Sequence, residues 1–209
     1  DYDSDSANDE AHFRRFFYAP DVAFFQTRGD KSFLSIALGS GYRAHPRDTT
    51  VTDRFYVVFD PFPFGPPTDS AGNIDYSALG PSGSDPLDEG DLFDATSTLA
   101  DRDSTAPHGW YKTLQGADEK ALAQATTFGG TTIFTTYLPH TNAAGAVCAG
   151  NLGSGRTYIL NPLTGGGMVD TGDSNPSEYI QLAHSGIPPA ATIVYTDASE
   201  TYLNQNGDP

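Results

Sequence analysis

The stretch from Ser35 to Asp60, SIALGSGYRAHPRDTTVTDRFYVVFD, constrains the fold most, because it places two runs of strand-forming residues on either side of a short polar loop. The apolar run SFLSIALG stops at glycines, and the aromatic and β-branched run RFYVVFD stops at a proline-rich turn. Both runs are predicted to be strands. The loop and its ends carry six charged or ionisable residues: Arg43, His45, Arg47, Asp48, Asp53 and Arg54.

The rest of the chain repeats this pattern of short strands and frequent turns. With 22 glycines, 15 prolines and 12% aromatic residues, its composition favours an all-β fold. FRRFFYAPDVAFFQT predicts two strands around a proline kink, and Gly129-Gly130 predicts a hairpin turn. RTYILNPLTGGGMVD predicts another hairpin, and EYIQLAHSGIPPAATIVYTD predicts two strands around a Pro-Pro break. DLFDATSTL is expected to form one helical turn, capped by Asp91 or by Asp88 just before it.

Charge and cysteine content exclude several classes of function. The net charge of −16 should repel nucleic acid and anionic lipid, so neither is expected as a partner. An acidic surface suits an extracellular or saline setting and attracts cations, although solubility alone also explains it. Cys148 is the only cysteine, which excludes an intrachain disulfide and a zinc cluster and favours a buried thiol. No segment approaches the roughly 18 apolar residues of a membrane span.

Six phrases, in chain order, carry a resemblance to a known family: RRFFYAPDVAF, SIALGSGYRAHPRDTTVTDRFYVVFD, DLFDATSTL, GWYKTLQGADEKALAQATTFGGTTIFTTYLP, GRTYILNPLTGG and GIPPAATIVY. From Phe13 to Tyr195 the chain resembles the C-terminal β-propeller domain of PilY1-type type IV pilus tip proteins. The resemblance implies antiparallel meanders that form the last blades of a quinoprotein-dehydrogenase-like propeller. We therefore expect an acidic leader (residues 1–12), a partial propeller domain (13–197) and a tail (198–209). The chain opens on Asp1 without an initiator Met, which suggests a processed piece of a longer protein.

The resemblance also implies a function. It indicates a protein exported through the periplasm to the cell surface and pilus tip, which acts in pilus biogenesis, attachment and motility by binding, not catalysis. Its expected partners are the other part of the same propeller, neighbouring pilus or minor pilin subunits, and a host or abiotic surface. Two alternatives stay open: a structural subunit that assembles by edge-strand pairing, and a quinone-dependent dehydrogenase-like propeller. The dehydrogenase alternative lacks support in the sequence, because Trp110 is the only tryptophan and is better explained as core.

Three sets of residues are candidates for a site. Relatives in this family often carry a calcium loop with oxygen ligands at alternate positions, and Asp1, Asp3, Asp5 and Asp9 follow that spacing. Ser6 stands where such a loop needs a turn glycine, so a solvated leader is the preferred interpretation and a calcium site the alternative. In the loop set, Arg43, His45, Asp48, Asp53 and Arg54 are interpreted as a structural clamp between blades, with ligand contact as the alternative. In the proline-rich insertion from Pro61 to Pro67, Phe62 and Phe64 are predicted to contact a partner.

Overall fold

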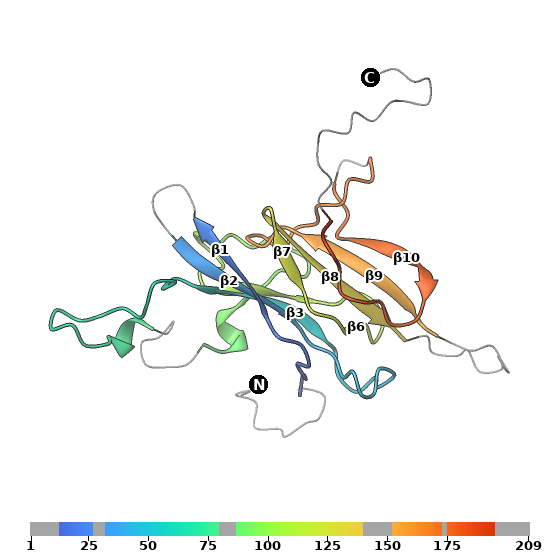
Figure 1. The fold of residues 1–209 in the computed structure, drawn as a ribbon, viewed down its shortest axis with the longest axis horizontal. Coiled ribbons are helices and arrows are strands. Elements are labelled where there is room, and N and C mark those ends of the chain that lie inside the picture. Colours follow the sequence, from blue (N-terminus) through green and yellow to red (C-terminus); the bar gives the residue numbers. More distant parts are fainter. Residues whose placement is uncertain (1–12, 27–31, 80–86, 140–151, 173–174, 195–209) are drawn as a thin grey trace, which may run out of the picture.

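The computed structural model of the chain describes residues 13–26, 32–79, 87–139, 152–172 and 175–194. Within these ranges the regular elements are strands and short 3-10 turns (Figure 1). The strands are β1 (Asp21–Gln26), β2 (Ser32–Gly39), β3 (Arg54–Asp60), β4 (Phe93–Asp94), β5 (Gly109–Thr113), β6 (Lys120–Ala121), β7 (Thr126–Phe128), β8 (Thr131–Leu138), β9 (Ser154–Leu160) and β10 (Tyr179–Ser185). The turns are η2 (Tyr76–Ala78) and η3 (Glu89–Asp91). The all-β prediction is confirmed.

The first sheet has the strand order β1-β2-β3-β5-β4. Its first four strands are antiparallel neighbours, and the two-residue β4 adds to β5 in parallel. The two strands predicted around the charged loop are therefore present as β2 and β3, and they pair with each other. Both alternate side chains between the two faces of the sheet, with Phe55 and Val57 pointing to the buried face.

The second sheet has the order β10-β9-β8-β6, and β7 also pairs with β8. Because β6 and β7 pair with opposite ends of β8, they act as one interrupted strand, and the sheet is a four-stranded antiparallel meander. The predicted hairpin at Gly129-Gly130 is confirmed, since it joins β7 to β8 and both glycines have positive φ. Within the described residues, both sheets are open.

Four local predictions were wrong or only partly right. The segment before Pro20 is not a strand: Phe16 and Phe17 pack on Tyr56 and Tyr42, and the Arg15 carbonyl accepts a hydrogen bond from Gly41 outside any ladder.

After β9 and after β10, the second predicted strands are reduced to isolated bridges or absent from the described residues. The helical turn does form, as η3 with Asp88 as its N-cap, but the residues that follow it enter β4. After β9 and after β10, prolines and glycines lie where a continuous ladder of strands would need backbone donors and side chains.

The core lies between the two sheets, which pack face to face. Phe55 of β3 stacks on Phe134 of β8 with ring centroids 3.6 Å apart, and Phe134 stacks in turn on Tyr158 at 4.9 Å. Trp110 is fully buried beside them, and its indole N–H donates to the carbonyl of Pro162 at 2.8 Å. The expectation that Trp110 belongs to the core is confirmed.

The outer faces of the two sheets differ. Residues 187–191 cross the outer face of the second sheet, where the Thr135 hydroxyl donates to the Pro189 carbonyl at 2.8 Å and Pro188 packs over Gly155 (Figure 1). The outer face of the first sheet leaves Val22 55% exposed and Phe24 52% exposed. Among the described residues, no helix has the length and apolar character needed to cross a membrane.

Candidate functional site

The charged loop begins at a close contact between the two sheets. The amide of Ala121, in β6, donates to the carbonyl of Ser40 at 3.0 Å. A Cβ atom on Gly39 would collide with the side chain of Ala121, and one on Gly41 would lie 2.9 Å from the Ala121 carbonyl. Glycine at these two positions therefore lets the end of β2 approach the second sheet. In the signature segment, the stretch from Ser35 to Asp60, the GSG motif (Gly39, Ser40 and Gly41) therefore forms a contact between the sheets.

Asp53, the last residue of the loop, is buried against Lys120 of β6. The Lys120 Nζ lies 3.5 Å from the Asp53 Oδ2, and the two side chains are 1% and 3% exposed. The Ser40 hydroxyl donates to the other Asp53 oxygen at 2.6 Å. Burial raises the pKa of Asp53, while the Ser40 hydrogen bond and the charge of Lys120 oppose this rise. The ion pair ties the two sheets together inside the core.

A second buried acid, Glu119, organises the interior side of the second sheet. It accepts hydrogen bonds from the guanidinium of Arg156 at 2.7 Å, the amide of Gly116 at 2.7 Å and the hydroxyl of Thr136. The Tyr158 hydroxyl also donates to it, at 3.3 Å. Burial and the nearby Glu119 charge raise the pKa of Tyr158 far above its usual value. The carboxylate thus has a hydrogen-bond network that offsets the cost of its burial.

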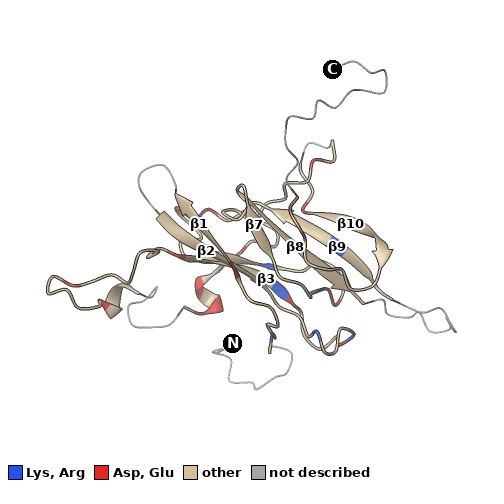
Figure 2. Cartoon of the chain, in the orientation of Figure 1, with Lys and Arg blue, Asp and Glu red and all other residues tan. Residues whose placement is uncertain are grey.

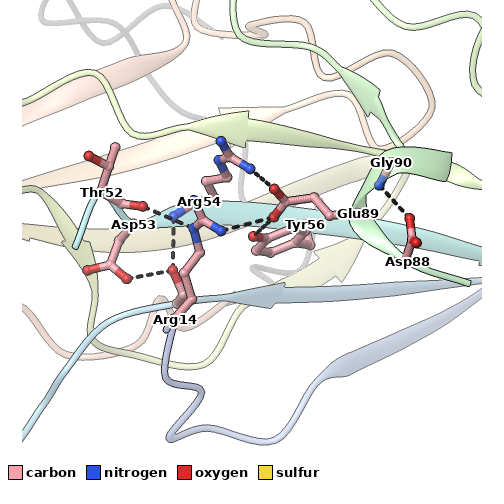
Figure 3. Close-up of polar contacts among 9 residues, drawn as sticks. Arg14, Thr52, Asp53, Arg54, Tyr56, Asp88, Glu89 and Gly90 are labelled. Atoms are coloured by element: carbon pink, nitrogen blue, oxygen red, sulfur yellow. Dashed lines mark hydrogen bonds and ion pairs between the residues drawn. The ribbon is translucent and has the colours of Figure 1, made fainter. Parts of the chain in front are cut away.

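Glu89 holds the segment before β1 against the outer face of the first sheet (Figure 3). Its carboxylate accepts from Arg14 at 3.2 Å, from the Tyr56 hydroxyl at 2.5 Å and from Arg54. The Arg54 guanidinium also lies 4.4 Å from the centre of the Tyr111 ring. Two arginines and one tyrosine therefore meet on a single acid that comes from turn η3.

A hollow of about 640 Å³ opens beside the charged loop, and residues from two segments line it, among them Arg15, Tyr42, His45, Arg47, Asp48 and Thr50. Figure 2 shows basic residues of the segment before β1 and of the loop after β2 at the same end of the molecule. The Arg15 guanidinium lies 4.0 Å from the Tyr42 ring centre and 4.0 Å from the Asp48 carboxylate. Hydrogen bonds from the side chain and backbone of Thr50 lower the pKa of Asp48.

The five residues predicted as a clamp do not form one cluster. Asp53 reaches the second sheet, and Arg43 does so too, because its guanidinium donates to the Leu122 carbonyl at 3.0 Å. Arg54 instead turns to the outer face of the first sheet. His45 and Asp48 line the hollow, and their side chains form no hydrogen bond with each other. The loop therefore divides into an inter-sheet part and an open, solvent-facing part.

The two phenylalanines predicted to contact a partner differ in exposure. Phe64 is 86% exposed, and its ring lies 5.8 Å from that of Phe24 in β1. Phe62 is half-buried, and its amide donates to Asp60 at 2.8 Å. The proline-rich loop thus extends the apolar outer face of the first sheet at Phe24.

The proposed calcium ligands Asp1, Asp3, Asp5 and Asp9 lie outside the described residues. Within the described ranges, no group of three His, Cys, Asp or Glu side chains is placed to hold a metal ion.

Sequence reasoning missed the acids and the lysine that complete these contacts. Glu119 and Lys120 are adjacent charges in ADEKALA, directly before the apolar residues Ala121, Leu122 and Ala123. Because charged side chains are rarely buried unless they are paired, burial of this segment would require ion pairs. Glu89 had no such signal, because its partners lie at least 33 residues away. Arg15 was missed because its segment was predicted to be an ordinary strand.

No protein-family model, curated protein or solved structure matches this chain. The family resemblance of the sequence phrases therefore stays a prediction.

Proposed function

We propose that this chain is part of a type IV pilus-associated tip protein at the cell surface, which acts in pilus biogenesis, attachment and motility by binding and not by catalysis. The observation that carries the proposal is the signature segment from Ser35 to Asp60. Its most particular wording, SGYRAHP to DRFY, coincides with the contact between the sheets and with the hollow. These residues thus carry the family resemblance and also line an exposed hollow, which supports a role in recognition.

The architecture supports placing the chain in a propeller. Each sheet contains a four-stranded antiparallel path of the size of a propeller blade, and the two pack face to face. On the outer face of the first sheet, Val22 pairs with Ile36 and Phe24 with Leu34 across the strands. This apolar row favours a further sheet packed there, supplied by the other part of the same propeller or by a neighbouring subunit.

A genetic experiment tests the pilus function. The parent gene is deleted and then complemented with the wild-type gene, and surface pili, attachment and twitching are measured. We expect loss of surface pili or attachment on deletion and recovery on complementation. Normal piliation together with normal attachment after deletion would refute the proposal.

One structural observation favours the alternative of assembly through edge strands. Among the described residues, β10 pairs only with β9, so its other edge has no strand partner, although the Tyr179 carbonyl there accepts the Ser177 hydroxyl. This alternative predicts self-association that depends on concentration. A monomer in sedimentation at high protein concentration, with β10 amides that exchange freely with deuterium, rules it out.

Calcium binding by the acidic leader is a separate part of the proposal. It rests on the alternate spacing of Asp1, Asp3, Asp5 and Asp9. Calcium is titrated into the full chain and into a variant with Asp1, Asp3 and Asp5 replaced by alanine. Weaker binding by the variant is the expected result, and equal binding would exclude these residues as ligands.

A further inference from the structure

The hollow beside the charged loop holds positive charge that is not neutralised, in a chain of net charge −16. Elsewhere in the described residues, six cations are paired with acids: Arg14 and Arg54 with Glu89, Arg102 with Asp103, Lys112 with Glu178, Lys120 with Asp53 and Arg156 with Glu119. Arg15, by contrast, is 46% exposed and only reaches Asp48 at 4.0 Å. Arg47 is exposed and forms no ion pair with the residues that the structure describes.

Asp48 does not cancel both arginines. Its Oδ1 accepts the Thr50 amide at 2.9 Å and the Thr50 hydroxyl at 2.5 Å, which fixes the loop, and only its Oδ2 faces Arg15, at 4.0 Å. One carboxylate against two guanidinium groups leaves one net positive charge at the lining, and His45 adds an imidazole N–H donor. A second, very small cavity shares Arg15, Tyr42 and Asp48 with the lining of the hollow and borders the buried Lys120 and Asp53.

The geometry of the guanidinium groups and the net charge of the lining indicate which ligand fits the hollow. A guanidinium presents a planar fork of donors that matches a carboxylate, and a single net positive charge balances a monovalent carboxylate better than a divalent phosphate. The Tyr42 ring is already stacked on Phe17, at 5.9 Å, and covered by the Arg15 guanidinium. It is therefore not free to stack on a sugar ring, which favours a peptide carboxylate over a carboxylated saccharide.

We propose that the hollow lined by Arg15, His45 and Arg47 binds a side-chain carboxylate of an acidic polypeptide partner. This inference rests on the proposed binding function and names the chemistry of its partner. The exposed arginines supply charge-assisted hydrogen bonds at the rim, and Thr50 and Asp48 hold the loop in shape.

The experiment titrates the full chain with an acetylated, amidated tetraglutamate peptide and follows binding by calorimetry. The matching tetraglutamine peptide controls for backbone contacts. We expect the tetraglutamate peptide to bind and the tetraglutamine peptide not to bind. The binding should weaken at an ionic strength of about 1 M, where the Debye length is about 3 Å. Arg47→Gln and Arg15→Gln should each weaken binding about tenfold, the loss expected for one charge-assisted hydrogen bond.

Arg43→Gln is the matched control, because it removes the same charge from the same loop but its guanidinium bonds the Leu122 carbonyl outside the lining. Circular dichroism checks that each variant is folded. Equal weakening by Arg43→Gln and Arg47→Gln, or no binding of the glutamate peptide, would overturn the site. Tighter binding of glucuronate than of the peptide overturns the polypeptide assignment, and tighter binding of inorganic phosphate overturns the carboxylate assignment.

The two proposals can fail separately. Peptide binding that survives in a chain whose gene deletion leaves pili and attachment normal would overturn the pilus function and keep the site. Absent peptide binding, together with loss of pili on deletion, would overturn the site and keep the pilus function.

Discussion

Replacing Lys120 by methionine should destabilise the fold strongly, because it leaves the Asp53 carboxylate buried without its counter-charge. The two charged groups are 3.5 Å apart and nearly inaccessible to water. With an effective dielectric constant of about 20, their attraction is about 5 kcal/mol. Breaking one side of a buried pair typically costs about 3–5 kcal/mol, because the remaining charge keeps its desolvation penalty. We therefore expect Lys120→Met to lower the free energy of unfolding by about 3–5 kcal/mol at neutral pH.

The loss should depend on pH in a defined direction. Burial already raises the pKa of Asp53, and removal of Lys120 raises it further. Between the unfolded and folded pKa values the folded chain holds a proton that the unfolded chain releases, so stability falls as pH rises through that window. Near the ordinary aspartate pKa of about 3.9, the folded carboxyl is protonated and most of the penalty disappears.

Urea unfolding measures these effects, with the fluorescence of the fully buried Trp110 as the probe. The double variant Asp53→Asn with Lys120→Met is the matched control, because it removes both charges and keeps the side-chain shapes. It should recover most of the stability lost in Lys120→Met. A double variant as unstable as Lys120→Met, or a loss that is equal at about pH 4 and at pH 8, would refute the reasoning from an uncompensated charge.

Three further predictions follow from the same structure. Glu119→Gln should lower the free energy of unfolding by about 2–4 kcal/mol, measured in urea. It should also lower the raised pKa of Tyr158, so that one tyrosine ionises at a lower pH in an alkaline absorbance titration. An unchanged titration would contradict the effect of Glu119 on Tyr158. Gly109→Ala should lower the free energy of unfolding by more than about 3 kcal/mol, because the new Cβ would collide with the backbone of β3. Gly130→Ala is the control, since Gly130 also has positive φ but faces open space, and it should cost about 1 kcal/mol. Equal shifts of the melting temperature in the two variants would disprove the clash. Phe64→Ser should change stability by less than about 0.5 kcal/mol yet reduce surface attachment, and unaltered attachment removes Phe64 from the contact surface.

The sequence was sufficient to predict β2, β3 and the hairpin between β7 and β8, because their alternation and turn residues are local properties. It misassigned the segment from Phe13 to Tyr18, whose strand-forming residues pack on side chains of the loop and of β3. The same error hid the hollow, because Arg15 reaches it only through that packing.

The charged loop shows the same limit. Its residues were predicted to act as one group, but their division into inward and outward contacts depends on partners such as Lys120 and Glu89. Those partners are brought together by sheet packing and not by spacing along the chain. Propensity predicts elements well, whereas long-range ion pairs need the tertiary structure.

Residues 187–191, which cover the outer face of the second sheet, make the two outer sides of the molecule different. A neighbour that packs on the first sheet beside β1 meets the half-exposed Val22 and Phe24. On this face the Phe64 ring lies against Phe24, and Glu89 and the segment before β1 occupy the part near Tyr56. A neighbour on the other side must first remove residues 187–191 and break the bond between Thr135 and Pro189. A further sheet therefore has a more direct approach to the β1 side of the first sheet than to the second sheet, which residues 187–191 cover. If these sheets belong to a ring, the ring closes through the Pro188-Pro189 segment and not through direct contact between sheets.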